Sequence, residues 1–320
     1  MAFLDLPLDH LQTYTGTNPR PAGFDGYWDR ALAELDETEP APEITPARGF
    51  SVPFARCEDL LFTGVGGARI YAKLVRPTHP STPVPGVLGF HGYKGASEEW
   101  PQLMKWVGAG VACAFLDCRG QGGRSIDPGG VTGNTHHGHI IRGLADGPEH
   151  LYYRSVFLDT VQLARVVAAL DDVDSARMGC FGASQGGGLS LACAALHPSI
   201  KRCVSIYPFL SDYKRVWKID IKNSAYAEIE RYFRHNDPTH ARADETWTAL
   251  GHIDVHHLAP RITAEVLMGL SQQDNVCPPS TQFAAYNAIR STKSCDLFPD
   301  FAHEHLPGFW ERAYPFLIGL

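Results

Sequence analysis

The chain has 320 residues, of which 44% are hydrophobic and 20% charged, and its formal net charge is -7. These values are typical of a globular protein with one large core, and the acidic balance argues against a nucleic-acid-binding protein. No apolar stretch approaches the ~18 residues that a membrane span needs, and the first residues lack the basic region of a secretory signal. The eight cysteines are scattered singly, so we expect reduced thiols and a cytoplasmic protein.

The first third of the chain contains an arm and a hairpin. Residues 1–50 are rich in proline and acidic side chains and include one predicted helix over 24–36, so we expect an N-terminal arm on the outside of the domain. Two segments, 57–63 and 68–76, alternate apolar and polar residues across a glycine-rich turn. This pattern predicts a β-hairpin.

From Val84 onward, short apolar segments alternate with amphipathic ones. Strands are predicted over 85–90, 111–116, 177–181, 202–206, 262–270 and 293–298. Helices are predicted over 99–107, 152–170, 187–196, 280–289 and 307–318. The alternation indicates an α/β protein with a mostly parallel central sheet and helices on both faces.

Two segments interrupt this rhythm. Residues 122–150 are rich in glycine and too long for a plain connection, so we expect a loop that projects toward a partner. Residues 210–259 are polar, helical in tendency and rich in His and Tyr, so we expect a small helical cap inserted between two core strands. The prediction is one domain over 1–320 that carries an arm, a projecting loop and a cap.

A G-x-S-x-G pentapeptide, Gly182-Ala183-Ser184-Gln185-Gly186, lies between a predicted strand and a predicted helix. This is the arrangement of the nucleophile elbow in α/β-hydrolases, where the serine occupies a sharp, strained turn and the glycines avoid collisions across it. Ser184 is therefore the predicted nucleophile, and the N–H of Gln185 is the predicted donor to a developing oxyanion. The alternative is an ordinary glycine-rich turn with a solvated serine.

Proteins with this fold carry the acid and the base after the nucleophile, in the order Ser, Asp, His. Asp274 lies in the loop after the predicted strand 262–270, and His303 lies in the loop after the last predicted strand. We expect Asp274 to orient His303, and His303 to take the proton of the nucleophile. Asp300 is the main competitor to Asp274 but precedes the histidine by only three residues, and Asp254 falls within the presumed cap.

The loop after the first core strand is the expected source of the second oxyanion donor. His91-Gly92-Tyr93 occupies this loop, and the N–H of Tyr93 is the candidate.

Three features together resemble the acetyl xylan esterase / cephalosporin C deacetylase family of carbohydrate esterases. They are Arg119-Gly120-Gln121, the Gly-x-Ser-Gln-Gly form around Ser184, and the pair His303-Glu304. The likeness runs from about residue 24 to the end of the chain.

The resemblance implies an α/β-hydrolase that removes acetyl groups from small acetylated sugars and from related esters such as cephalosporin C. It also implies a ring-like homohexamer whose active sites face an internal cavity, and it places the oxyanion donors at Tyr93 and Gln185. For Arg119 and Gln121 we expect a supporting role that ties their loop to neighbouring carbonyls and carboxylates. A plain turn with a solvated arginine fits the sequence alone equally well.

Two histidine-rich stretches, 136–139 and 252–257, invite a metal hypothesis. Neither shows a recognised ligand spacing together with a carboxylate or thiol set, so we expect no metal and no cofactor. The glycines of 129–133 are not followed by the Lys-Ser/Thr of a phosphate-binding loop, which argues against nucleotide binding.

Other functions remain as alternatives. A broader carboxylesterase, a dienelactone hydrolase or a prolyl-type peptidase would share the fold, but the dienelactone type favours cysteine at position 184, and a peptidase would bring a propeller domain. A non-catalytic binding protein would belong to a different class. Because Ser184, Asp274 and His303 are all present, the leading hypothesis is an acetyl esterase with a small acetylated substrate and no nucleic-acid or membrane partner.

Overall fold

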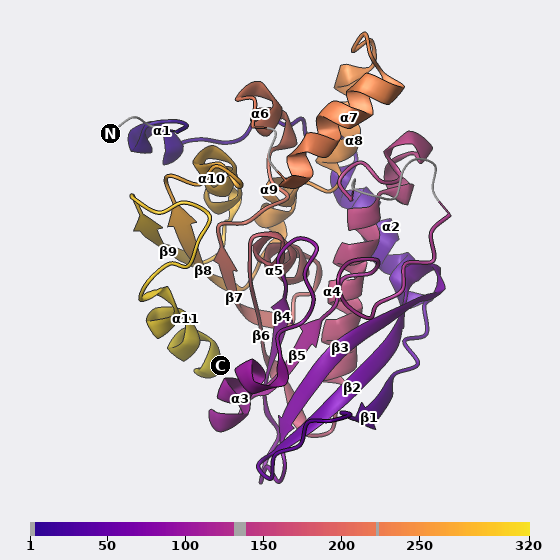
Figure 1. Ribbon diagram of the computed structural model, residues 1–320, viewed down its shortest axis with the longest axis vertical. Coiled ribbons are helices and arrows are strands. Elements are labelled where there is room, and N and C mark those ends of the chain that lie inside the picture. The colour runs from indigo at the N-terminus through magenta and orange to yellow at the C-terminus, as the bar shows by residue number, and fades with distance from the viewer. Residues whose placement is uncertain (1–3, 131–138, 222–223) are drawn as a thin grey trace.

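The computed structural model describes residues 4–130, 139–221 and 224–320. The described residues form a nine-stranded sheet with the order β1-β2-β3-β5-β4-β6-β7-β8-β9 (Figure 1). The strands are β1 Glu43–Pro46, β2 Ala55–Gly64, β3 Ala68–Pro77, β4 Val84–Phe90, β5 Ala112–Leu116, β6 Val173–Ala183, β7 Ile200–Ile206, β8 Glu265–Ser271 and β9 Lys293–Phe298. The α-helices are α1 Leu8–Leu11, α2 Phe24–Asp36, α3 Trp100–Gly108, α4 Tyr152–Ala168, α5 Gln185–Leu196, α6 Tyr213–Lys218, α7 Ala227–Asn236, α8 Ala243–Gly251, α9 Val255–Leu258, α10 Pro279–Ala288 and α11 Phe309–Ile318.

The sheet is antiparallel at one end and parallel over the rest. Strands β1, β2 and β3 form a meander, and β3 pairs antiparallel with β5. From β5 through β4, β6, β7 and β8 to β9, every pairing is parallel. The mostly parallel sheet predicted from the alternating pattern is therefore confirmed, and all the carboxyl ends of the parallel strands lie at one edge.

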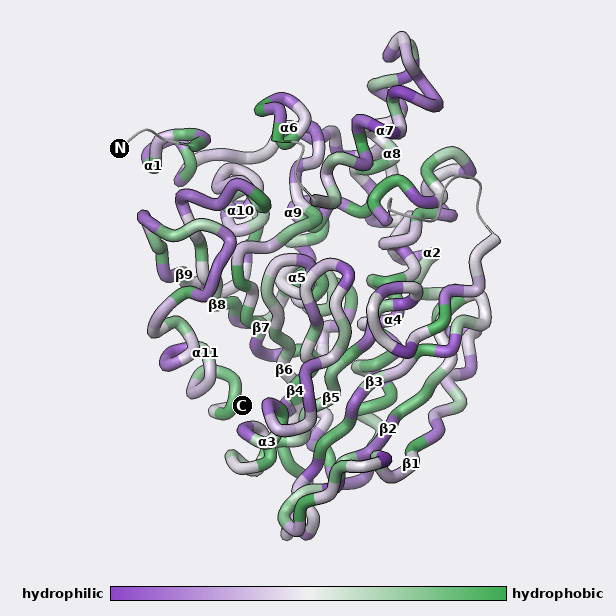
Figure 2. Tube along the Cα trace, viewed as in Figure 1, coloured by the Kyte–Doolittle hydropathy of each residue, from purple (hydrophilic) through white to green (hydrophobic). Residues whose placement is uncertain are grey.

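Helices cover both faces of this sheet. Helices α3 and α11 pack on one face, where Trp106, Phe181 and Phe309 belong to one apolar cluster. Helices α2, α4, α5 and α10 contribute to the larger apolar cluster on the other face. The central strands are mainly hydrophobic along their length, whereas the outer ends of α7 and α8 are largely hydrophilic (Figure 2). This distribution is the one expected for strands that are buried on both faces.

The structure corrects two details of the sequence prediction near the elbow. Strand β6 begins at Val173, several residues before the predicted start at 177, and α5 begins at Gln185 rather than at about 187. Helix α5 therefore starts directly after Ser184, so the N–H of Gln185 has no acceptor within the helix.

Residues 210–259 join β7 to β8, which are neighbours in the sheet. They form α6, α7, α8 and α9, and α9 packs against α5 and α10. The N-terminal segment is tied to this region by hydrogen bonds from Tyr14, Thr17 and Asn18 to the buried carboxylate of Asp212. In the part of the chain that the structure describes, we find no helix with the length and apolar character of a membrane span.

Candidate active site

The elbow at Ser184 has the strained backbone that the pentapeptide predicts. Ser184 has φ 58° and ψ -121°, in the left-handed half of conformational space. A Cβ at Gly182 would lie 2.4 Å from the backbone of Gly186, and one at Gly186 would lie 2.0 Å from the carbonyl oxygen of Phe90. Both contacts are with backbone atoms that have no room to move, so only glycine fits at either position.

Ser184, His303 and Asp274 form a chain of two hydrogen bonds. The His303 Nε2 lies 3.0 Å from the Ser184 Oγ, and its Nδ1 lies 2.8 Å from the Asp274 Oδ2. The three residues come from the ends of three strands, β6, β9 and β8, because the parallel sheet places these ends at one edge. The structure thus brings together the three residues predicted from the sequence.

Asp274 is fully buried and held in a fixed orientation. Its Oδ1 accepts the backbone N–H groups of Val276 at 2.8 Å and Cys277 at 2.7 Å, which leaves Oδ2 directed at the imidazole. The two competing aspartates lie elsewhere: Asp300 is exposed in its loop, and Asp254 caps α9. Asp274 is therefore the carboxylate that the fold places against His303.

The loop after β4 is fixed to the elbow by side-chain amides. The Gln121 Oε1 accepts the backbone N–H of Lys94 at 2.8 Å, and the Gln121 amide N–H donates to the Gln185 Oε1 at 2.8 Å. The Gln185 amide N–H donates in return to the Gln121 Oε1 at 3.1 Å. Gln121 thus connects the loop that carries Tyr93 to the first residue of α5, which is where the two predicted oxyanion donors lie.

Arg119 forms a buried ion pair rather than a solvated turn. Its guanidinium makes two hydrogen bonds to the Asp159 carboxylate on α4, at 2.7 and 2.6 Å, and both side chains are almost fully buried. Burial disfavours the charge of Arg119, but the adjacent Asp159 outweighs it and raises the pKa of Arg119. The pair fixes the loop after β5 to α4, so Arg119 supports the site without facing it.

Two cavities meet at Ser184 and His303. The first has a volume of about 340 Å³, and the residues that line it besides these two are Gly92, Tyr93, Phe209, Ala225, Tyr226 and Val276. The second, of about 480 Å³, extends toward α11 and includes among its lining residues Phe181, Tyr207, Leu306, Phe309 and Trp310. Both cavities contact Tyr93, and both walls include several aromatic side chains. Ser184 is therefore accessible from two sides to a small molecule.

Several residues of the site have no signal in the sequence. Tyr207 packs against the His303 ring with centroids 4.6 Å apart, and burial raises the pKa of Tyr207 to about 12. Glu228 of α7 accepts a short hydrogen bond from the Tyr93 hydroxyl. Both contacts join residues far apart in the chain, so only a comparison of related sequences would have indicated them.

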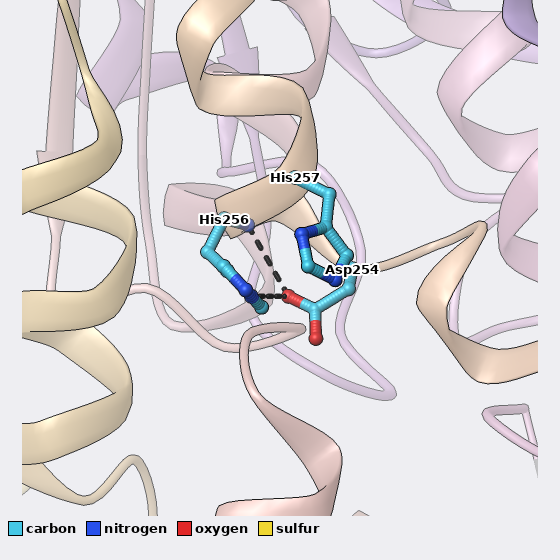
Figure 3. Close-up of side chains that lie close together, drawn as sticks. All are labelled: Asp254, His256 and His257. Atoms are coloured by element: carbon cyan, nitrogen blue, oxygen red, sulfur yellow. Dashed lines mark hydrogen bonds and ion pairs between the residues drawn. The ribbon is translucent and has the colours of Figure 1, made fainter. Parts of the chain in front are cut away.

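The histidine-rich stretches have separate structural settings. Residues 136 and 137 lie outside the described residues, whereas the His139 Nδ1 lies 2.8 Å from the Tyr93 hydroxyl. In the second stretch, Asp254, His256 and His257 gather at the start of α9 (Figure 3). Potential ligand atoms do meet here, although the spacing is not a recognised one.

The side chains of Asp254, His256 and His257 all form hydrogen bonds with other groups of the protein. The Asp254 Oδ1 lies 2.6 Å from the His256 Nδ1, and Asp254 also accepts the backbone N–H of Asp212. Burial opposes charge on the His256 ring, but the Asp254 carboxylate outweighs it and raises the pKa of His256. The His257 Nε2 lies 3.1 Å from the Asn18 carbonyl oxygen. The cluster joins the N-terminal segment to the 210–259 insertion.

The sheet is mostly parallel, a strained serine lies between β6 and α5, and a histidine and an aspartate lie at the ends of later strands. This combination defines the α/β-hydrolase class. The family model described as acetyl xylan esterase (AXE1) matches residues 1–320. The chain therefore belongs to the acetyl xylan esterase family, which places it among the carboxylic ester hydrolases.

Individual relatives agree with this placement. Acetyl xylan esterase 1 from Thermoanaerobacterium sp. JW/SL YS485 is 51% identical with a TM-score of 0.96, over 98% of this chain and 99% of that one. The acetyl xylan esterase from Paenibacillus sp. R4 is 32% identical with a TM-score of 0.93, again over 98% and 99%. The acetyl esterase Axe7A of Xylanibacter ruminicola is 31% identical over 166 residues, which are 52% of this chain. The match spans only 36% of Axe7A, about a third of its length.

Proposed function

We propose that the protein is a serine esterase that removes acetyl groups from acetylated saccharides and from related small acetyl esters such as cephalosporin C. The observation that carries this proposal is the pair of hydrogen bonds from His303 to Ser184, at 3.0 Å, and to Asp274, at 2.8 Å. The substrate class is supported by the acetyl xylan esterases with which this chain aligns over 98% of its length.

In the first half of the proposed reaction, the Ser184 Oγ attacks the acetyl carbonyl carbon and its proton passes to the His303 Nε2. The carbonyl oxygen becomes an oxyanion and is held by the backbone N–H groups of Gln185 and Tyr93. The bond to the sugar oxygen then breaks, and His303 gives its proton to that oxygen. The products of this half are the free alcohol and an acetyl group bonded to Ser184.

In the second half, a water molecule attacks the acetyl carbonyl carbon and gives a proton to His303. The bond to the Ser184 Oγ breaks, acetate leaves, and the proton returns to the serine. Asp274 keeps the Nδ1–H of the imidazole directed at itself and stabilises the transient imidazolium. The bonds that its Oδ1 accepts from Val276 and Cys277 restrict the carboxylate to this role.

Hydrolysis of p-nitrophenyl acetate, butyrate and octanoate, by the wild type and by Ser184→Ala, tests this function. We expect fast, serine-dependent hydrolysis of the acetate with a steep loss for the longer chains. Equal rates on all three esters would instead indicate a carboxylesterase of broad specificity. The absence of turnover on any ester, including acetylated xylo-oligosaccharides, would favour a binding protein on a hydrolase fold.

We also propose that the protein assembles as a homohexamer in the cytoplasm. Large hydrophobic side chains at Phe54 and Ile126 are 52% and 61% exposed, and Ile126 belongs to the 122–150 loop that is expected to face a partner. Light scattering at micromolar concentration is expected to give the mass of six chains, and a monomer mass would contradict the assembly.

The eight cysteines are all free, which fits a reducing compartment. Recovery of the protein from the medium of its host would contradict the compartment.

A further inference from the structure

Glu228 of α7 is a buried carboxylate that contacts the loop next to the nucleophile. Its side chain accepts a short hydrogen bond from the Tyr93 hydroxyl through Oε1, and its Oε2 accepts the backbone N–H of Ile140 at 3.0 Å. Only 2% of Glu228 is exposed. Burying a carboxylate carries a large desolvation cost, which these two donors offset. The contact joins the 210–259 insertion directly to the loop that follows β4.

The Tyr93 side chain is held from three segments of the chain. Besides Glu228, its hydroxyl lies 2.8 Å from the His139 Nδ1, and its ring lies 5.9 Å from that of Phe209. Burial lowers the pKa of His139 to about 4, so this imidazole is neutral at neutral pH and can donate or accept at Nδ1 according to its tautomer. With Glu228 as the acceptor of the hydroxyl proton, the tyrosine oxygen can accept from His139.

The backbone at Tyr93 lies in a tight turn. Lys94 follows it with φ 63°, and the Gly95 N–H donates to the Gly92 carbonyl oxygen at 3.0 Å. Gln121 accepts the N–H of Lys94, and the carbonyl oxygen of Gly92, in the peptide that carries the Tyr93 N–H, lies 2.7 Å from the His91 Nδ1. The tyrosine hydroxyl adds a further anchor to this turn. Because the ring of Tyr93 is joined to its backbone through Cα and Cβ, holding the hydroxyl limits how far its N–H can turn.

We propose that Glu228 is a positioning residue that holds the Tyr93 N–H in its oxyanion-binding orientation, acting through the tyrosine hydroxyl. This inference rests on the proposed function. An oxyanion donor acts on charge that develops only in the transition state, so its displacement lowers kcat more than it raises KM. Complete loss of one such donor costs about 10²–10³ in kcat, and we expect a tilted donor to cost about 10- to 100-fold.

The test is a set of variants measured on p-nitrophenyl acetate. Glu228→Ala is expected to lower kcat by about 10- to 100-fold while KM changes by less than about threefold. Glu228→Gln is expected to keep most of the wild-type kcat. Its amide oxygen can accept the N–H of Ile140, and its amide N–H can donate to the Tyr93 oxygen. The Tyr93 hydroxyl would then donate to His139. Glu230→Ala is the matched control on the same helix, since Glu230 pairs with Arg234 at the surface, and it is expected to behave as wild type.

A double-variant cycle decides whether Glu228 acts through the hydroxyl. Tyr93→Phe removes one oxygen atom and is expected to lower kcat about as much as Glu228→Ala. The two changes together are then expected to cost little more than either alone. Additive losses would overturn the proposal, as would an effect of Glu228→Ala confined to KM or to the melting temperature. Tyr93→Phe keeps the test decisive if Glu228→Ala does not fold, because wild-type kcat in Tyr93→Phe contradicts the proposal.

Failure of this inference differs from failure of the proposed function. If Ser184→Ala hydrolyses the ester as fast as the wild type, the proposed function is wrong and the Glu228 series has no bearing on it. If Ser184→Ala is inactive but the Glu228 and Tyr93 variants turn over like the wild type, the function stands and the positioning role is wrong.

Discussion

At the scale of single residues, the site consists of a serine whose position is fixed by backbone strain and a histidine whose position is fixed by hydrogen bonds. Ser184 can adopt φ 58° because the glycines at 182 and 186 leave room for the backbone to approach itself closely around the turn. His303 is held between Ser184 and the buried Asp274. These groups would require little rearrangement to start the proposed acyl transfer, which is the property that preorganised sites share.

The first prediction concerns the three side chains of this site. Ser184→Ala and His303→Ala are expected to lower kcat for p-nitrophenyl acetate by about 10⁶, and Asp274→Asn by about 10⁴, the scale of the corresponding changes in serine proteases. Asp300→Asn is the control, because Asp300 is exposed in its loop, and it is expected to keep wild-type kcat. A silent Asp274→Asn together with an inactive Asp300→Asn would show that the acid is misassigned.

The sequence predicts Ser184, Asp274 and His303 because each follows a recognisable apolar strand in an order that the fold dictates. Glu228 has no such signal. Its contact with Tyr93 spans 135 positions and depends on how α7 folds over the sheet. Residues that act through long-range packing therefore escape pattern analysis, even where the reacting groups themselves do not.

At the scale of elements, the position of Ser184 depends on the β6–turn–α5 unit. The apolar core strands from β4 to β9 are predictable from their alternation with helices. Strand β1, by contrast, lies in a proline-rich stretch, is mostly exposed and has no apolar alternation, so nothing in residues 43–46 marks it as a strand. The order of the strands in the sheet is also absent from the pattern, because β5 and β4 exchange places relative to the chain.

The second prediction concerns the glycines of the elbow. Gly186→Ala is expected to destabilise the protein by about 1–3 kcal/mol and to abolish most esterase activity, because the new Cβ would overlap the Phe90 carbonyl oxygen. Gly108→Ala is the matched control at the end of α3, where an added Cβ meets no atom within 4 Å. Thermal denaturation and p-nitrophenyl acetate hydrolysis measure the two effects. Equal stability of the two variants would contradict the steric argument.

At the scale of the whole molecule, insertions from distant parts of the chain converge above the sheet edge. The N-terminal segment is hydrogen-bonded to Asp212. Ala225 and Tyr226 of the 210–259 insertion line the cavity beside Ser184, next to Phe209. Glu228 connects α7 to the loop after β4. The wall of the cavity beside Ser184 is thus built by several segments together. Their local composition predicts helices but not the cavity that they enclose.

The third prediction is a loss of stability in mild acid. Burial lowers the pKa of His139, His197 and His257 to about 4 each, from an ordinary value of 6.5. The unfolded chain therefore binds protons at these sites below about pH 6.5, whereas the folded chain does so only near pH 4. Because the unfolded state gains protons first, stability is expected to fall as the pH drops from about 6.5 to about 4, and these histidines add no further loss below that.

A variant isolates this contribution from that of the carboxylates. His197→Gln removes a titrating ring whose Nε2 is buried without a hydrogen-bond partner in the described structure. Between pH 7 and pH 4.5, the free energy of unfolding of His197→Gln is expected to fall by less than that of the wild type, with a difference on the order of 1 kcal/mol. The melting temperature of His197→Gln is expected to fall less over the same range. The exposed His79→Gln serves as the control. The same fall in melting temperature between pH 7 and pH 4.5 in all three proteins would contradict this contribution of His197.

The central claim is that Ser184 carries the acetyl group between the two halves of the reaction. Rapid-quench mass spectrometry of the enzyme mixed with excess p-nitrophenyl acetate tests this claim most directly. We predict a transient gain of one acetyl group on the peptide that contains Ser184, formed at the rate of the first p-nitrophenol released and absent from Ser184→Ala. Acetylation at another residue, or a burst of p-nitrophenol that persists in Ser184→Ala, would contradict the account.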